Sequence, residues 1–162
     1  FRSTQENLWP HWYRQRVEML WSTLNLYHDT GLTMQDKRIL FRSRESLPQL
    51  FSDFNDNCVL VHGCFTLRSM LKDARTDQLL AMVGPGMMLW APREYELFRL
   101  ADGGLGEQLL WRYLQRAPVA ESFVWRRWLY QLWDEVESLV NTGRFDRARF
   151  SFAAKSILPW IA

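Results

Sequence analysis

Apolar residues recur at helical spacing along most of the chain, and the longest such run lies between Asn57 and Asp73. Its stripe, at intervals of three and four residues, is Leu60, Cys64, Leu67 and Leu71. This spacing predicts a central helix covered by its neighbours. The alternative is a short buried strand at Cys58–Val61 that ends at Gly63, because Val and Cys suit strands. We prefer the helix because the periodicity continues for two turns past the glycine.

Helical spacing also predicts further helices on both sides of this segment. Thr33 and Asp36 have the spacing of a capping box, and Gly143 is placed as a C-terminal cap. Asp146 begins the last predicted helix, and Met87–Trp90 is expected to be a buried apolar connector. The predicted helices cover residues 10–30, 33–41, 73–83, 92–101, 105–116, 119–141 and 146–158.

Signals for β-hairpins, such as Asn-Gly between alternating runs, are absent from the sequence. The sequence therefore predicts an all-α fold of seven or eight helices around residues 57–72. It predicts a single domain over residues 1–162, in which residues 1–7 are loose. Because the chain opens on Phe1 rather than Met, we expect it to be a piece of a longer protein.

Composition narrows the possible functions. The net charge is only +2 and the charges are interspersed, which does not suit a nucleic-acid track. Nine Trp and 15% aromatic residues indicate large contact surfaces. Two cysteines six positions apart form no disulfide framework, which favours a reducing compartment. No apolar run reaches the roughly 20 residues that a membrane span needs.

Cys58, His62 and Cys64 form the one cluster of metal-ligand residue types in the sequence. On a helix Cys64 would point roughly 160° away from His62. A structural zinc site needs four ligands, whereas His11 and His28 are isolated. A Cys–His nucleophile pair would lack a third orienting residue. We therefore predict no metal and no cofactor, and expect both thiols to be small buried side chains.

Two other patterns could indicate catalysis. The glycine-rich stretches at 84–86 and 103–106 lack the Gly-Lys-Ser/Thr of a phosphate loop and are better explained as helix breaks. Asp134, Glu135 and Glu137 have no convergent partner, so they fit a solvated helix face better than acid–base catalysis. The sequence predicts no catalytic residue.

Trp and Arg are the residue types most enriched at binding hot spots. The candidate protein-binding residues are Trp125, Arg126, Arg127, Trp128 and Trp133, followed by Arg144 and Arg147, with Arg149 beside them. The alternative is that Trp125 is a core residue and the arginines solvate the helix. For Trp128 the core and interface interpretations are equally supported.

Residues 62–85, HGCFTLRSMLKDARTDQLLAMVGP, resemble the accessory subunit of the bacterial type III secretion sorting platform, the SctK family. Gly63-Cys64 and Leu67-Arg68 occupy matching places in that pattern. Leu47–Gln49 is similar to a segment that precedes it, and residues 105–118 are similar to the family's Leu-Gly-Glu helix with its Arg-Ala-Pro end.

This resemblance implies a non-enzymatic cytoplasmic adaptor at the inner-membrane face of a secretion apparatus. Such a subunit bridges the cytoplasmic domain of the inner-membrane ring protein to the pod protein of the platform. It would bind proteins rather than a small-molecule substrate, and it would approach the membrane only through the ring protein.

Two other functions stay open at the level of sequence. One is a helical regulatory or nucleic-acid-binding module with an Arg-rich surface, which the isoelectric point near 8.7 allows. The other is a small metal-dependent or thiol enzyme that uses Cys58 and His62.

Overall fold

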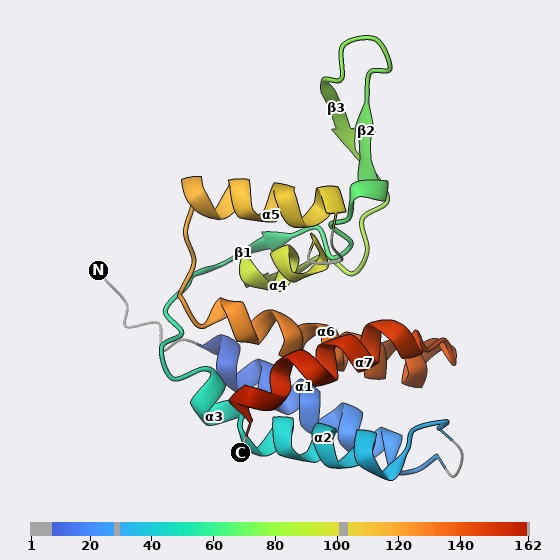
Figure 1. Cartoon of the computed structure of the whole chain (residues 1–162). Helices are drawn as coiled ribbons and strands as arrows, with labels where there is room; N and C mark the ends of the chain where they lie inside the picture. The colour runs from blue at the N-terminus through green and yellow to red at the C-terminus, as the bar shows by residue number, and fades with distance from the viewer. Residues whose placement is uncertain (1–7, 28–29, 101–103, 162) are drawn as a thin grey trace. The chain divides into compact units, whose positions relative to one another are not determined.

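The computed structural model describes residues 8–27, 30–100 and 104–161 (Figure 1). The chain divides into two compact units, which are described separately. Unit 1 combines Phe1–Asn55 with Ala120–Ala162, and unit 2 is Asp56–Val119. Within the described ranges, no helix is both long and apolar enough to span a membrane.

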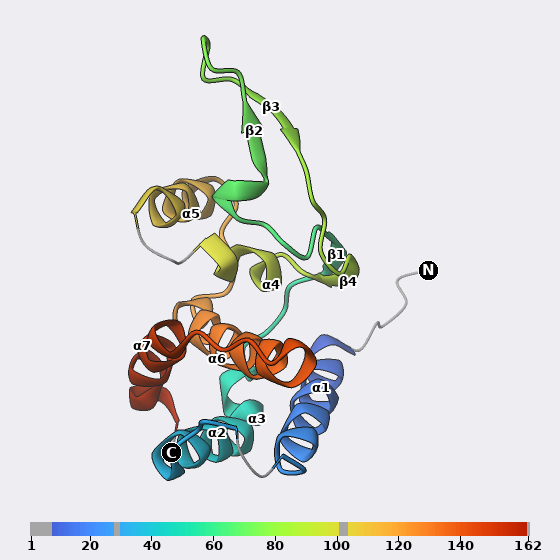
Figure 2. The same ribbon diagram turned by 90° about the vertical axis from the view of Figure 1, so that its right-hand side faces the viewer.

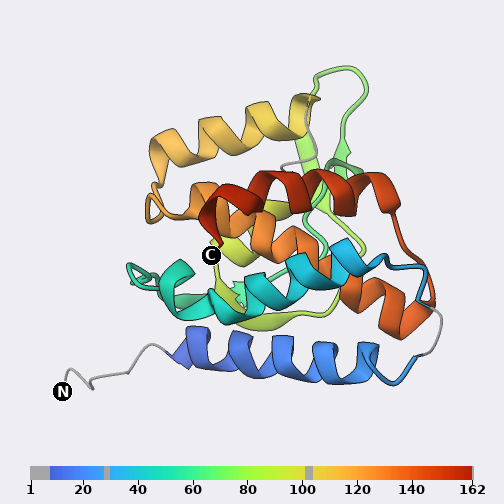
Figure 3. The same ribbon diagram turned by 60° about the horizontal axis from the view of Figure 1, so that its bottom comes forward.

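Unit 1 is helical and is built around its longest helix. The longest helix, α6, packs against both α1 and α7, and the helices of unit 1 lie side by side in Figure 3. The elements of unit 1 are α1 (Leu8–Leu24), α2 (Met34–Glu45), α3 (Leu47–Leu50), α6 (Phe123–Thr142), α7 (Arg147–Ile157) and the 3-10 helix η3 (Leu158–Trp160).

Large aromatic side chains fill the core of unit 1. Tyr13 on α1 meets Tyr130 on α6 edge to face, with ring centroids 5.0 Å apart. The Trp9 indole N–H donates to the Tyr130 hydroxyl at 3.2 Å. The Trp133 indole N–H donates to Ser43 Oγ at 3.1 Å. The indole N–H groups of Trp9 and Trp133 thus each have a partner from another helix, as is usual for a buried Trp.

Unit 2 contains two small antiparallel sheets, three short helices and one longer helix. Strand β1 (Cys58–Val61) pairs with β4 (Leu89–Pro92), and β2 (Met70–Lys72) pairs with β3 (Leu79–Met82). The β2–β3 hairpin extends as a long narrow arm in Figure 2. The helices of unit 2 are the 3-10 helix η1 (Leu67–Ser69), α4 (Glu94–Leu97), the 3-10 helix η2 (Phe98–Leu100) and α5 (Gly104–Arg116).

The prediction of a central helix between Asn57 and Asp73 is wrong, and with it the all-α fold class. This stretch forms β1, a loop, η1 and β2. The strand interpretation of Cys58–Val61 is the correct one, although only Val61 is buried. A helix over this stretch would have to pass Gly63, whose backbone has a left-handed φ of 76°.

Two neighbouring predictions are also wrong. The helix expected over residues 73–83 is the hairpin turn and strand β3. The connector Met87–Trp90 is not buried: Met87 is 62% exposed and Trp90, on β4, is 70% exposed. An apolar side chain in this region is therefore not necessarily buried.

Several local predictions are confirmed by the structure. Thr33 and Asp36 form the capping box of α2. Gly143 ends α6 with φ at 71°, and Asp146 caps α7 by accepting from the Arg149 N–H. Residues 1–7, predicted to be loose, lie outside the described residues, as do His28 and Gly103. The single-domain organisation stays a prediction.

Candidate functional site: the loop between β1 and β2

The loop His62–Ser69 makes polar contacts with α4 and with the connection between β3 and β4. It leaves β1 at Val61 and enters β2 at Met70 through the single turn of η1. The turn directly after β1 needs the positive φ of Gly63, which other L-residues rarely adopt.

Glu96 on α4 holds this loop from one side. One carboxylate oxygen accepts the Gly63 N–H at 2.9 Å and the other accepts the Phe65 N–H at 2.8 Å. The two bonds flank Cys64, so its backbone is fixed at both peptide neighbours. Hydrogen bonds to a charged acceptor are about twice as strong as neutral ones. The two bonds to Glu96, called the Glu96 clasp below, therefore fix the backbone of the loop around Cys64.

The connection between β3 and β4, residues 83–88, lies directly against the same loop. The Gly86 N–H donates to His62 O at 3.0 Å. A Cβ on Gly63 would lie 2.3 Å from Met87 O, and a Cβ on Gly86 would lie 2.6 Å from Gly63 O. Both glycines are therefore required by the close approach of two backbones.

Ser69 closes the loop from within. Its buried hydroxyl lies within donating distance of Cys64 O at 2.6 Å and Thr66 O at 2.9 Å, and it accepts the Thr66 N–H at 3.0 Å. The Val83 N–H donates to Ser69 O at 2.8 Å, which ties the β3–β4 connection to this end of the loop. The hydroxyl of Ser69 is thus used inside the loop.

The cysteines and the histidine predicted as metal-ligand types do not converge on a metal. Both Cys58 and Cys64 are free and exposed. Partial burial, and secondarily the Asp56 carboxylate, raises the pKa of the Cys58 thiol. Both ring nitrogens of His62 are buried without a hydrogen-bond partner among the described residues. In the described part of the chain, no group of three or more His, Cys, Asp or Glu could hold a metal.

The tryptophans predicted to bind a partner lie on α6 of unit 1. Trp128 and Trp133 are buried, whereas Trp125 is partly exposed and stacks on Trp160 at 4.4 Å between ring centroids. The guanidinium of Arg127 lies over the Trp128 ring at 4.2 Å. Their role in partner binding stays a prediction.

Arg126 is fully buried rather than solvating the helix. Its guanidinium donates to Leu50 O at 2.9 Å, to Asp53 Oδ1 at 2.8 Å and to Ser122 Oγ. Burial opposes the charged form of Asp53, but hydrogen bonds from Ser122 and Arg126 outweigh it and lower the pKa of that carboxyl. A buried charge that is paired in this way holds α3 to α6.

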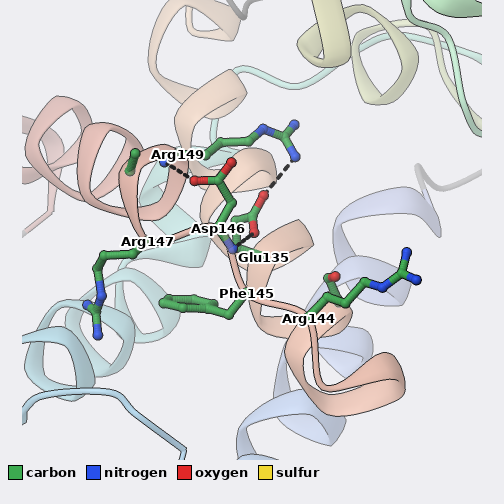
Figure 4. Close-up of a pocket in the computed structure, with 8 residues that line it drawn as sticks. Glu135, Arg144, Phe145, Asp146, Arg147 and Arg149 are labelled. Carbon is green, nitrogen blue, oxygen red and sulfur yellow. Dashed lines mark hydrogen bonds and ion pairs between the residues drawn. The ribbon is translucent and has the colours of Figure 1, made fainter.

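The arginines after Gly143 line an open depression of about 680 Å³ at the turn between α6 and α7 (Figure 4). Arg149 pairs with Asp134 at 3.1 Å and with Glu135 at 2.8 Å. Arg147 pairs with Asp36 at 2.6 Å, whereas Arg144 is exposed. The carboxylates predicted to be a solvated face are thus partly used in ion pairs that join helices.

The apolar spacing of residues 62–69 is that of a helix, so it does not predict the loop that the structure shows there. Two features of the sequence favour strands here. The β-type run Cys58–Val61 is followed closely by Gly63, and a pair of glycines follows at 84 and 86. Two such breaks separated by about twenty residues favour a turn after each strand over a continued helix.

The chain matches no protein-family model. It is 76% identical over 160 residues to the uncharacterized protein YcbJ of Escherichia coli strain K12, and equally to that of Shigella flexneri. The match covers 99% of this chain and 54% of each relative, so the chain spans about half the length of the curated relatives it matches.

The fold is similar to a crystal structure described as a "putative fructosamine-3-kinase" from Thermobifida fusca. The TM-score is 0.68 at 21% identity, over 93% of this chain and 51% of that chain. These findings overturn the resemblance to the secretion accessory subunit, and with it the predicted non-enzymatic adaptor and its ring and pod partners. The fold of the chain is similar to about half of that structure.

Proposed function

We propose that the chain is part of a kinase-like protein that binds a small phosphorylated molecule such as ATP. The loop His62–Ser69 would lie beside the phosphates of this ligand. The support is the likeness to a kinase structure over 93% of the chain, together with the order of the loop in unit 2. Kinase catalysis depends mainly on positioning and electrostatics, so an ordered loop is the part such a fold must supply.

The spacing of polar residues in the loop carries the proposal. Protein kinases place His, Asp and Asn in their catalytic loop as His-x-Asp-x-x-x-x-Asn. His62, Cys64 and Ser69 have the same spacing, directly after a strand. The histidine is kept, while a thiol and a hydroxyl stand in the places of the carboxylate and the amide.

Hydrogen bonds with two side chains hold the backbone of the loop in place. Glu96 fixes the peptides on both sides of Cys64, and Ser69 fixes the carbonyl of Cys64. Cys64 itself is exposed and forms no disulfide. A rigid backbone that presents an exposed side chain is the arrangement expected beside a ligand.

The test is nucleotide binding by the full-length protein. We would titrate ATP and ADP by calorimetry into the wild type, a Cys64→Trp variant and a Leu80→Trp control. Leu80 is exposed on β3 of the same unit. We expect binding to the wild type and the control, and a loss of at least about tenfold in affinity for Cys64→Trp, because the indole would occupy the ligand's place.

The absence of any nucleotide binding by the wild type would contradict the proposal. So would a Cys64→Trp variant that binds like the wild type while keeping its thermal stability.

A further inference from the structure

Kinase folds imply a divalent cation beside the nucleotide. In protein kinases Mg²⁺ is held by the Asp of Asp-Phe-Gly and by the Asn of the catalytic loop. Mg²⁺ prefers carboxylate, carbonyl and water oxygens in an octahedral arrangement. We therefore ask whether the residues of this chain at the two facing loops can supply such ligands.

Neither loop carries a suitable side chain. Residues 62–69, HGCFTLRS, and residues 83–88, VGPGMM, contain no Asp, Glu, Asn or Gln. Cys64 stands at the place of the catalytic Asp, and a soft thiolate suits Zn²⁺ or Cu⁺ rather than Mg²⁺. Ser69 stands at the place of the Asn, but its hydroxyl already bonds Cys64 O and Thr66 within the loop.

The two carboxylates that lie between these loops in the sequence are used elsewhere. Between Ser69 and the end of β4 the sequence has only Asp73 and Asp77. Both lie at the exposed turn of the β2–β3 hairpin. Backbone N–H groups of Thr76 and Arg75 lower the pKa of Asp73, and Lys72 lowers that of Asp77.

Glu96, the carboxylate that does reach the loop, has one oxygen on each of two backbone N–H groups. If it turned toward a metal, these two amides would lose their acceptor, and an N–H left unpaired in this way is unfavourable. The side chains of residues 62–69 and 83–88, with Glu96, therefore do not fit a kinase-type Mg²⁺ site.

We infer that the site takes its phosphorylated ligand without a divalent cation, and that Arg68 supplies the positive charge. This inference rests on the proposed function. Arg68 is exposed on η1, one residue before Ser69, and has no ion-pair partner among the described residues. A guanidinium can bind phosphate oxygens through two parallel hydrogen bonds.

The deciding experiment compares ATP affinity of the full-length wild type in Mg²⁺ with its affinity in EDTA. We expect the two dissociation constants to agree within about threefold, because no protein group here would hold the cation. Inorganic phosphate serves as a second probe, since an arginine site without a metal should show competition by free phosphate.

Two outcomes overturn the inference, and they are distinguishable. ATP binding that falls more than about tenfold in EDTA would contradict the metal-free site but leave the proposed function intact. Absence of nucleotide binding in both buffers would overturn the inference and the proposed function together.

The role of Arg68 is tested by Arg68→Ala with Arg75→Ala as the matched control. Arg75 is an exposed arginine at the hairpin turn of the same unit. We expect Arg68→Ala to weaken ATP binding by about tenfold or more, and Arg75→Ala to leave it unchanged. Equal affinities of the two variants would contradict the assignment of Arg68.

Discussion

The two units obtain order from different sources. In unit 1, long helices bury large side chains such as Tyr13, Leu129 and Phe150. In unit 2, apolar side chains on the strands are largely exposed, including Leu60, Leu80 and Trp90. Backbone hydrogen bonds, the Glu96 clasp and close glycine contacts hold the loops there instead. Apolar residues therefore report burial along the helices of unit 1, whereas on the strands of unit 2 they do not, and the buried apolar side chains of unit 2, such as Phe98, Leu100 and Leu110, lie on its helices.

The strongest test of this difference is a core truncation on α7. Phe150→Ala should reduce the free energy of unfolding by about 3–5 kcal/mol, because it removes a fully buried ring and leaves a cavity. The matched control is Phe152→Ala on the same helix, where the ring is 57% exposed and meets Trp128 edge to face. Its cost should be at most about 1.5 kcal/mol. Chemical denaturation measures both, and equal losses would contradict the role given to burial.

For unit 2 the sensitive positions are the glycines. Gly63→Ala should destabilise the unit by at least about 2 kcal/mol, because a left-handed φ is strained and the new Cβ would overlap Met87 O. Gly84→Ala has a similar φ of 62° but open space around the Cβ, so about 1 kcal/mol is expected.

Amide hydrogen exchange at Gly86 and Val83 would report these two glycine variants locally, since both amides donate to the loop. Faster exchange in Gly63→Ala than in Gly84→Ala is the expected result. The same rate in both variants would show that the approach of the two backbones does not hold the loop.

The same contrast explains which parts of the fold could be predicted from sequence. The helix of residues 105–116, the caps at Thr33 and Gly143, and the stripe on α6 were found because side-chain periodicity matches burial there. Strands β1–β4 have only three or four residues each and no alternating burial. Their sequence carried no period of two, so spacing alone predicted a helix.

The candidate site could be predicted only in part. The sequence identifies Cys58, His62 and Cys64 as metal-ligand residue types, but it predicts a helix where the structure has a strand and a loop. Glu96 was not considered, because its contact with residues 63 and 65 links positions more than thirty residues apart. The sequence predicts an exposed Arg126, because no local pattern shows the polar partners that make its burial possible.

The ion pair of Asp53 and Arg126 should make the stability of unit 1 depend on pH. The lowered pKa of Asp53 means that its pairing with Arg126 stabilises the fold above the ordinary value of 3.8, and this is lost as the pH falls through the lower folded value. Asp53→Asn should cost about 1 kcal/mol at neutral pH, a modest loss because the carboxylate is partly exposed. The difference from the wild type should shrink below pH 3.8 in acid titrations followed by thermal unfolding. A difference that is constant over this range would show that the ion pair does not contribute.

The smallest effect is expected at Leu80, on the exposed β3. Replacing a leucine in a core costs several kcal/mol, but Leu80 is 65% exposed. Leu80→Thr keeps a residue that suits strands, so the free energy of unfolding should change by no more than about 0.5 kcal/mol. Denaturant unfolding of this variant is compared with that of Leu40→Thr, at a fully buried position of α2. A loss at Leu80 as large as at Leu40 would mean that another surface covers the hairpin in the full-length protein.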